Sequence, residues 1–335
     1  MRKLKTVILA AGMGTRMKSD QPKCLHEILG HPMLYYVIQA ARECGSDEIC
    51  VVIGHKGDLV RQAFADQDDI TFVRQAEQKG TGHAVMMALD FIGEEDCDVM
   101  ILFGDTPLVR GSVLQEMRLA HAKQHNAVTV LSAFLDDPAG YGRILRDDQN
   151  RFQGSVEHKD ASPDELKIHE VNSGIYCFSS EALRYALGRI DNNNRQGEYY
   201  LPDTIRVLLD KGSKAEALMT RSKSIVKGVN NRQQLLESQM ILRQRINSAH
   251  MEEGVSIMDD YSILIAPEAV IGRDTRIMPG TVIEGHTVIG SQCIIGPNAH
   301  LIDATLGDRV QIASSTVRNA SVEDDTFVPP YQLIQ

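Results

Sequence analysis

Two short loops in the first third of the chain carry residue types suited to binding phosphate and a divalent cation. The first reads Leu9-Ala10-Ala11-Gly12-Met13-Gly14-Thr15-Arg16-Met17. Glycine has no Cβ, so Gly12 and Gly14 let a backbone approach a phosphate closely, and Arg16 and Lys23 add positive charge there. The loop has neither the Walker pattern nor the third glycine of a dinucleotide fingerprint. A tight turn with solvated cations is therefore the alternative interpretation.

The second loop, Phe103-Gly104-Asp105-Thr106-Pro107, places a carboxylate directly after an apolar run. Such a group can hold Mg²⁺, which prefers oxygen ligands, although a helix N-cap before Pro107 is the alternative. A third segment, residues 75–83 with the sequence QAEQKGTGH, lies between the two loops. Gln75 could read the edge of a base there, and the nearby glycines could admit its ring. An ordinary loop that caps a helix from His83 is the alternative.

The elements around these loops alternate between strand and helix. We expect strands at 6–10, 48–53, 71–74 and 99–103, and helices near 33–44, 58–64 and 83–89. This alternation predicts an α/β fold with a Rossmann-like, mostly parallel sheet and helices on both faces. Ligands bind such sheets at the carboxyl ends of the strands, where both loops are expected.

Near the C-terminus, aliphatic residues recur every six positions, and a small residue stands four places after each. The aliphatic series is Ile265, Ile271, Ile277, Ile283, Ile289, Ile295 and Leu301. The small series is Ala269, Thr275, Thr281, Thr287, Cys293, Ala299 and Thr305. Period six predicts a parallel β-helix of hexapeptide repeats, with three hexads and eighteen residues in each coil. A β-sandwich is the alternative, but its strands would repeat every two residues.

Apolar residues at helical spacing predict a linking helix at 233–250. We therefore expect an α/β domain at 1–229, the linking helix at 230–250 and the β-helix at 251–335.

Composition excludes several other classes of protein. The chain has 335 residues and a formal net charge of −10, which argues against general binding to nucleic acid or anionic membranes. No apolar run approaches the length of a transmembrane helix. Six cysteines without a CxxC pair indicate reduced thiols. We therefore expect a cytoplasmic protein.

The motifs, taken in order, resemble those of the sugar-nucleotide pyrophosphorylases. More narrowly, they resemble bacterial GlmU-type N-acetylglucosamine-1-phosphate uridyltransferases, in which the uridyltransferase is fused to an acetyltransferase. After LAAGMGTRM and Pro22-Lys23, the matching segments are 75–84, 104–105, 136–144, 156–161, 170–176, 192–203 and 228–235.

The resemblance implies a role for each matching residue. Residues around the nucleotide would be Leu9, Ala10, Ala11, Gly12, Gln75, Gly80, Thr81, Phe103 and Gly104. Arg16 and Lys23 would be catalytic, since they bind the phosphates and stabilise charge at the α-phosphorus. Asp105 and Asn230 would hold Mg²⁺, and Gly142, Glu157 and Asn172 would contact the N-acetylated sugar. Phe103 departs from the family, which often has Tyr at that position.

The implied reaction joins UTP and N-acetylglucosamine 1-phosphate to give UDP-N-acetylglucosamine and pyrophosphate. The UDP-N-acetylglucosamine would be a precursor for peptidoglycan and lipopolysaccharide. The resemblance also implies a left-handed β-helix that assembles into a homotrimer. A second departure follows Val322, where the family typically continues with a Gly-Pro-Phe and Arg-Pro-Gly stretch. We therefore expect the acetyltransferase part of the β-helix to be missing, and no acetyltransferase activity.

Three other functions stay open at this point. A related enzyme could use another sugar, such as glucose 1-phosphate, although segments 156–161, 170–176 and 228–232 favour the N-acetylated sugar. A regulatory subunit could bind ligand without catalysis, but Arg16, Lys23, Asp105 and Asn230 are all present. A free-standing acetyltransferase is disfavoured by the expected missing coils.

Overall fold

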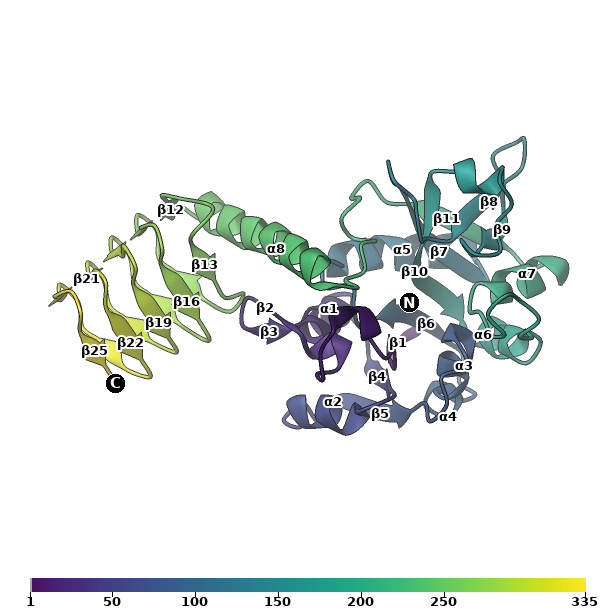
Figure 1. The fold of residues 1–335 in the computed structure, drawn as a ribbon, viewed down its shortest axis with the longest axis horizontal. Helices are drawn as coiled ribbons and strands as arrows, with labels where there is room; N and C mark the ends of the chain where they lie inside the picture. Colours follow the sequence, from purple (N-terminus) through teal and green to yellow (C-terminus); the bar gives the residue numbers. More distant parts are fainter. Residues whose placement is uncertain (1) are drawn as a thin grey trace. The chain divides into compact units, whose positions relative to one another are not determined.

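The computed structural model describes residues 2–335 and divides into two compact units. Unit 1 comprises residues up to 26 together with 32–234, and unit 2 comprises 27–31 together with 235–335. Figure 1 labels the helices and strands of both units.

Unit 1 is built on a mixed sheet, nine-stranded within residues 2–335, whose main path runs β11-β7-β10-β6-β1-β4-β5. The path strands are β1 Lys3–Ala10, β4 Glu48–Ile53, β5 Ile70–Arg74, β6 Cys97–Phe103, β7 Val128–Phe134, β10 Glu170–Ser179 and β11 Ala215–Met219. Strands β6, β1, β4 and β5 are parallel, whereas β10 runs antiparallel to both β6 and β7. A side ribbon of β8 Arg143–Arg146 and β9 Phe152–Val156 joins the sheet through β10.

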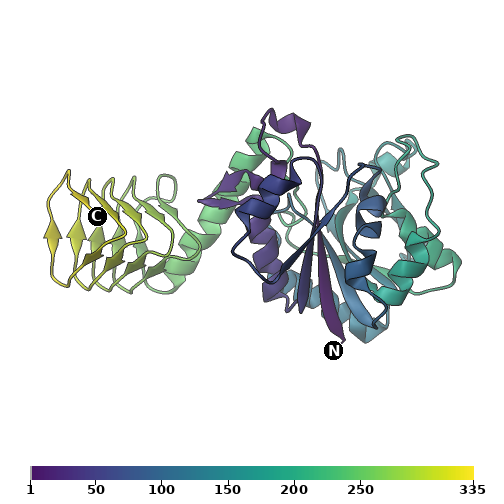
Figure 2. The ribbon, with the colours of Figure 1, turned by 90° about the horizontal axis from the view of Figure 1, so that it is seen from below.

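Helices cover both faces of this sheet. One apolar cluster joins the sheet to α1 Met33–Glu43, α2 Gly57–Ala63 and α5 Gly111–Gln124. The other joins it to α3 Thr81–Met86, α4 Leu89–Ile92, α6 Ser180–Leu187 and α7 Asp203–Asp210. The sheet is thus buried on both sides, which explains the apolar runs at 7–10 in β1 and 99–103 in β6. Figure 2 shows the strands of unit 1 with helices on either side.

The predicted α/β architecture is confirmed, with three local differences. β1 begins at Lys3, three residues before the expected start, and the helix expected at 83–89 is divided into α3 and α4. The glycine loop after β1 leads into a short 3₁₀ turn, Thr15–Met17, rather than directly into an α-helix. That turn is bounded by Gly14 and Lys18, both in the left-handed region, so a longer helix cannot propagate there.

Unit 2 contains a stack of triangular coils formed by three parallel sheets. Their strand orders are β12-β15-β18-β21-β24, β13-β16-β19-β22-β25 and β14-β17-β20-β23. The bounds are β12 Ser256–Ile257, β13 Leu264–Ile265, β14 Val270–Ile271, β15 Arg276–Ile277, β16 Val282–Glu284, β17 Val288–Ile289, β18 Ile294–Ile295, β19 His300–Ile302, β20 Thr305–Leu306, β21 Gln311–Ile312, β22 Thr316–Arg318, β23 Ser321–Val322, β24 Phe327–Val328 and β25 Leu333–Ile334. The aliphatic series from Ile265 to Leu301 is buried inside the coils, as period six predicts. This arrangement is consistent with a left-handed β-helix of hexapeptide repeats.

The small series holds until its last member. Ala269, Thr275, Thr281, Thr287, Cys293 and Ala299 are buried. Thr305 is exposed, however, and Ala304 takes the inward place. The ladder accounts for this shift, because Val288 pairs with Thr305, one residue short of the eighteen-residue interval. The small residue that is buried at this corner is therefore Ala304 rather than Thr305.

Unit 2 also contains most of the long helix α8 Arg232–Glu252 and most of the small hairpin of β2 Glu27–Ile28 and β3 His31–Pro32. Helix α8 agrees with the helix expected at 233–250. Unit 1 has two further 3₁₀ turns, Lys23–Leu25 and Glu165–Lys167. Among residues 2–335, none of the helices has both the length and the apolar character needed to cross a membrane.

Ile289 and Val288 allow a direct test of the inward and outward assignment of the coils. Ile289 is 2% exposed, whereas its neighbour Val288 is 42% exposed. Ile289→Ala should lower the free energy of unfolding by roughly 2–5 kcal/mol, because it leaves a cavity inside the coil. Val288→Ala should change it by less than about 0.5 kcal/mol. Urea unfolding followed by circular dichroism measures both, and equal losses would contradict the assigned register.

Candidate active site

The phosphate-type loop and the Asp105 loop leave the sheet side by side. The parallel register of β1 and β6 pairs Leu9 with Phe103, and the backbone N–H of Gly104 donates to the carbonyl of Leu9 at 3.0 Å. The last residues of both strands are therefore held together at one edge of the sheet. This is the edge at which α/β proteins bind ligands.

Gly14 allows the first loop to fold tightly over Lys23. Its φ is +61°, and a Cβ at this position would lie 2.6 Å from Cβ of Lys23. Only glycine fits this contact without displacing the neighbouring side chain. The loop thereby brings Lys23 to the same edge of the sheet as Asp105.

Four charged or polar side chains converge beside these loops. The ammonium group of Lys23 contacts the carboxylate of Asp105 and also donates to Oδ1 of Asn230 at 2.8 Å. Nη2 of Arg16 donates to the same Asn230 oxygen at 2.8 Å. The backbone N–H of Val229 donates to the carbonyl of Asp105 at 2.9 Å, which joins the two distant chain segments. The catalytic and metal-binding residues implied by the resemblance are thus neighbours in space.

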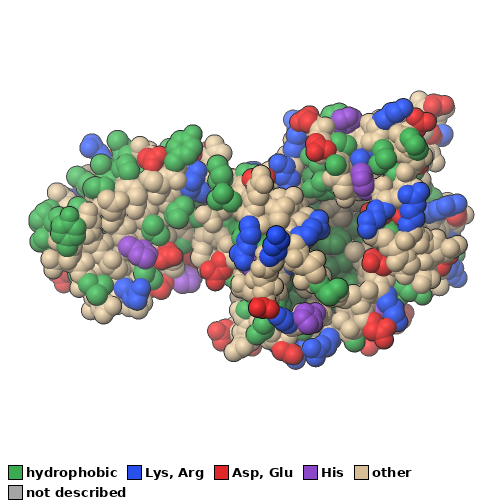
Figure 3. Space-filling model, viewed as in Figure 1, with side chains coloured by type: hydrophobic (Ala, Val, Ile, Leu, Met, Phe, Trp, Pro, Cys, Tyr) green, Lys and Arg blue, Asp and Glu red, His purple; other side chains and the backbone are tan. Residues whose placement is uncertain are grey.

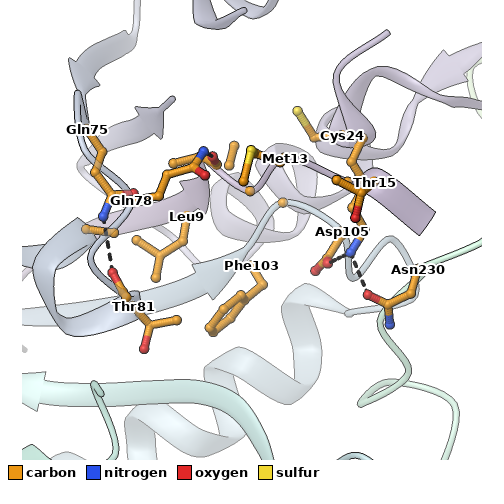
Figure 4. A pocket seen from close by; sticks show the side chains of 18 of the residues that line it. Leu9, Met13, Thr15, Cys24, Gln75, Gln78, Thr81, Phe103, Asp105 and Asn230 are labelled. Carbon is orange, nitrogen blue, oxygen red and sulfur yellow. Dashed lines mark hydrogen bonds and ion pairs between the residues drawn. The ribbon is translucent and has the colours of Figure 1, made fainter. Parts of the chain in front are cut away.

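A cavity of about 460 Å³ opens beside this cluster. All nine residues expected around the nucleotide line it, together with Arg16, Lys23, Asp105 and Asn230. Gln75, Gln78 and Thr81 gather at one end, and Asp105 and Asn230 lie at the other, with Phe103 between them (Figure 4). In the space-filling view, this face of unit 1 is hollowed, with Lys and Arg side chains on the rim (Figure 3).

The wall near Gln75 is held by bonds between distant loops. Gln75 is buried, and its side-chain amide contacts the carbonyl of Gly80 at 3.1 Å and Nδ1 of His83 at 3.0 Å. The N–H of Gly82 donates to the carbonyl of Tyr199, and the N–H of Tyr199 donates to the carbonyl of Lys79, both at 2.8 Å. Because Gln75 forms these internal bonds, it orders the wall as well as facing the cavity.

A second cavity, of about 370 Å³, adjoins the first. Gly142, Glu157 and Asn172, the three residues expected at the sugar, all line it. The Asn172 side chain donates to the hydroxyl of Tyr176 at 2.7 Å and accepts from the N–H of Gly174 at 2.9 Å. Asn172 is therefore fixed in place by the protein itself.

Glu157 lies in an environment that disfavours its charge. Burial raises the pKa of its carboxyl, and the nearby carboxylates of Asp203, Asp160 and Glu198 raise it further. A carboxyl with a raised pKa is suited to hydrogen bonding with neutral hydroxyl or amide groups rather than to pairing with a cation. This side of the second cavity therefore suits an uncharged, hydroxylated group.

The two cavities share a boundary that combines opposite charges. Arg16, Thr81, Phe103, Asp105 and Asn230 line both of them. Phe103 packs closely there, since a Cβ on Gly174 would lie 2.8 Å from its ring. A ligand in one cavity and a ligand in the other would meet beside Arg16 and Asp105.

The site contains little that could form a covalent intermediate. Cys24 lines the first cavity, but burial raises the pKa of its thiol to about 12. The thiol therefore stays protonated near neutral pH, and a protonated thiol is a poor nucleophile. The arrangement suits direct transfer between two bound ligands.

The donor atoms around Lys23 fit a divalent cation. The carboxylate of Asp105 and the amide oxygen of Asn230 already converge on one positively charged group. Within residues 2–335, no cluster of three or more His, Cys, Asp or Glu side chains could hold a metal ion. Mg²⁺ needs no such cluster, since it usually binds one or two protein oxygens together with phosphates and water.

Three lining residues were not assigned a role from the sequence. Gln78 donates to the carbonyl of Ala11 and so closes the first loop, Glu198 lines the first cavity, and Gln234 lines the second. Each lies within a motif that marks the resemblance. The motifs located these residues, but spacing alone could not show which side chains point into a cavity.

Comparison with known proteins first defines the class. Residues 5–226 match the nucleotidyl transferase family, and residues 268–303 match six repeats of the bacterial transferase hexapeptide. Unit 1 is therefore a nucleotidyltransferase that is joined in one chain to hexapeptide repeats.

The relatives then define the family. The chain is 44% identical to the bifunctional protein GlmU of Caldanaerobacter subterraneus and to that of Thermoanaerobacter pseudethanolicus. In both cases the match covers all of this chain and 72% of the relative. The GlmU of Clostridioides difficile is 42% identical over 99% of the chain. The chain belongs to the GlmU family, and this membership supports the predicted N-acetylglucosamine-1-phosphate uridyltransferase class.

One part of the predicted resemblance is not supported. We expected the acetyltransferase part of the β-helix to be missing, yet the hexapeptide region is present at 268–303 and folds into regular coils. The differences from the family after Val322 therefore do not show that coils or an activity are missing.

Gly80 offers a test of the wall that faces the cavity. Its φ is +103°, and a Cβ would lie 2.6 Å from the carbonyl oxygen of Tyr199. Gly80→Ala should therefore lower the free energy of unfolding by about 1–3 kcal/mol. Gly93 also has positive φ, +67°, but its Cβ would meet nothing within 4 Å. Urea unfolding should show a smaller loss for Gly93→Ala, and equal losses would contradict the close approach.

Proposed function

We propose that this chain transfers a uridylyl group from UTP to N-acetyl-α-D-glucosamine 1-phosphate. The products are UDP-N-acetylglucosamine and pyrophosphate. The observation that carries this proposal is the pair of adjoining cavities, which share Arg16 and Asp105 at their boundary. The first cavity has the glycine loop and Gln75 for a nucleotide, and the second has an uncharged polar wall for a sugar.

The reaction needs positioning and charge neutralisation more than acid–base chemistry. A phosphate oxygen of the sugar phosphate attacks the α-phosphorus of UTP, and a new phosphorus–oxygen bond forms. The bond to the bridging oxygen breaks on the opposite side, and pyrophosphate leaves with the electron pair. The attacking oxygen is already anionic near pH 7, so no proton has to be removed first. Arg16 and Lys23 stabilise the negative charge that develops around the α-phosphorus.

The residue roles follow the lining of each cavity. We assign Leu9, Ala10, Ala11, Gly12 and Gly104 to close backbone contact with the nucleotide. We assign Gln75, Gly80 and Thr81 to the uracil end, with Phe103 packed between the two ligands. Gly142, Glu157 and Asn172 bind the N-acetylated sugar.

Asp105 and Asn230 are the residues that would hold Mg²⁺. When bound there, the cation neutralises phosphate charge and orients the transferring group. Lys23 contacts both oxygens, so it is placed to move onto the phosphates when these oxygens bind the cation. The chain's own contribution is to keep its cationic side chains, Arg16 and Lys23, beside the two bound ligands.

Other interpretations fit these observations less well. An enzyme for glucose 1-phosphate would not need the motifs that mark N-acetylglucosamine enzymes at 156–161 and 228–232. A regulatory subunit would have no need for Arg16, Lys23, Asp105 and Asn230 in mutual contact. We therefore favour catalysis on the N-acetylated sugar.

The direct test is pyrophosphate release from UTP with N-acetylglucosamine 1-phosphate, glucosamine 1-phosphate or glucose 1-phosphate. Each reaction is run with Mg²⁺ and with a chelator in its place. Selective, Mg²⁺-dependent turnover of the N-acetylated sugar supports the proposal. Preference for glucose 1-phosphate, or no turnover of any sugar, would contradict it.

Arg16→Ala tests the assignment of charge stabilisation. Arg16 lies at the boundary of both cavities, so its loss should lower kcat by roughly a hundredfold or more, with a smaller effect on the KM for UTP. Lys18→Ala removes a nearby exposed cation that lines neither cavity, and it should leave kcat near the wild-type value. Initial-rate kinetics distinguish the two, and a raised KM alone would show that Arg16 only binds substrate.

We also propose that the chain forms a homotrimer through the β-helix. Outward-facing apolar residues on one sheet of the coils support an assembly surface, since Ile294 in β18 and Phe327 in β24 are 39% and 64% exposed in one chain. Sedimentation equilibrium should give a mass three times the 37.1 kDa of the chain. A monomeric mass at micromolar concentration would contradict this assembly.

The proposed functional division places the nucleotidyltransferase at 1–229, the linking helix at 230–250 and the assembly domain at 251–335. We propose a cytoplasmic location, which is supported by six free cysteines, all buried. Recovery of the chain outside the cytoplasm in cell fractionation would contradict that location.

A further inference from the structure

Gln234 lies in the first turn of α8 and lines the second cavity, beside the proposed metal-binding residue Asn230. None of the roles assigned above uses it. Its contacts nevertheless connect the start of this helix to the centre of the proposed site, and they suggest a specific function in the reaction.

The side chain of Gln234 reaches back over the segment that precedes the helix. Its Oε1 accepts the backbone N–H of Asn230 at 2.7 Å. In return, the backbone N–H of Gln234 donates to Oδ1 of Asn231 at 2.9 Å. Residues 230, 231 and 234 are therefore held by two bonds that run in opposite directions, as in a helix capping box.

The two bonds have separable purposes. The Asn231 side chain caps the helix, because it accepts a backbone N–H of the first turn. The Gln234 side chain instead bonds the N–H of Asn230, which lies before the cap and outside the helix. Helix α8 does not need this second bond to form its own ladder. The bond acts on the conformation of Asn230.

Asn230 is the residue at which this control would matter most. Its Oδ1 accepts hydrogen bonds from both Arg16 and Lys23, each at 2.8 Å. The preceding residue, Val229, is tied by its N–H to the carbonyl of Asp105 at 2.9 Å. Bonds from two successive backbone N–H groups, those of Val229 and Asn230, thus fix the path of the chain from which the Asn230 side chain extends.

We propose that Gln234 is a positioning residue for metal binding, which acts by holding the backbone of Asn230 so that its Oδ1 lies beside the group that the Asp105 carboxylate also contacts. This inference rests on the proposed function, because that function assigns the metal to Asp105 and Asn230. Residues that orient a metal ligand from behind commonly affect metal affinity by about tenfold or more.

The test is a titration of the whole chain with Mn²⁺. The electron paramagnetic resonance signal of the free ion measures how much Mn²⁺ stays unbound. Asp105→Asn defines which part of the binding belongs to this site. Gln234→Met keeps the side-chain length but removes the accepting oxygen, so it should weaken Mn²⁺ binding by about tenfold. Gln234→Glu retains an accepting oxygen and should bind Mn²⁺ no more weakly than the wild type.

Two controls separate positioning from a general effect on the helix. Gln244→Met makes the same change at an exposed position further along α8, and it should leave Mn²⁺ affinity unchanged. Asn231→Ala removes the helix cap but leaves the acceptor of the Asn230 N–H in place. It should lower the melting temperature more than Gln234→Met does, while changing Mn²⁺ affinity less.

The outcomes either support or overturn the proposal. Weaker binding in Gln234→Met that Gln234→Glu restores supports it. Unchanged Mn²⁺ affinity in Gln234→Met overturns it. Equal weakening of Mn²⁺ binding in Gln244→Met also overturns it. The proposal fails as well if Asp105→Asn binds Mn²⁺ as tightly as the wild type does. Pyrophosphate release by the wild type is measured alongside. No turnover together with the expected Mn²⁺ pattern would reject uridylyl transfer while leaving the role of Gln234 supported.

Discussion

The parallel pairing of β1 with β6 is the constraint on which the proposed site depends. It sets Leu9 opposite Phe103, and the N–H of Gly104 donates to the carbonyl of Leu9 just beyond the last pair. The glycine loop and Asp105 therefore leave the sheet from adjacent points. A shift of one residue in this register would turn every buried side chain of β1 to the other face of the sheet. Burial on both faces thus also fixes where the two loops emerge.

The remaining parts of the site are attached to this edge by polar contacts. Lys23 is drawn in by the close packing of Gly14, and Asn230 by the bond between Val229 and Asp105. The Asp105 carboxylate pairs with Lys23, whereas Arg16 and Lys23 both donate to the neutral amide oxygen of Asn230. A protein with a net charge of −10 can in this way keep a local cationic region for phosphates. Arg16 is held beside both cavities by its bond to Asn230, and such preorganisation is the condition for effective electrostatic stabilisation.

The sequence was most informative where one physical rule determines the pattern. Strands buried on both faces must be apolar throughout, so β4 at Glu48–Ile53 could be predicted at its observed bounds. Residues at the carboxyl ends of such strands could be assigned to a ligand-binding edge, and Asp105 lies there. Two features depended on tertiary contacts that no local pattern encodes. The antiparallel direction of β10 is set by long-range pairing, and the contact from Gln234 to Asn230 requires the exact path of the chain before α8.

The same distinction explains why the coils keep their form although the spacing of six does not hold throughout. Successive coils advance by eighteen residues from Val282 to His300, but by only sixteen from His300 to Thr316. The corners of successive coils nevertheless keep a residue with positive φ at the corresponding place, as at Gln292, Arg309 and Asp325. Ala304 provides the buried small side chain at the corner where one residue is lost. The constraint is therefore one buried aliphatic on each face and a tight turn at each corner, and the spacing of six is its commonest solution.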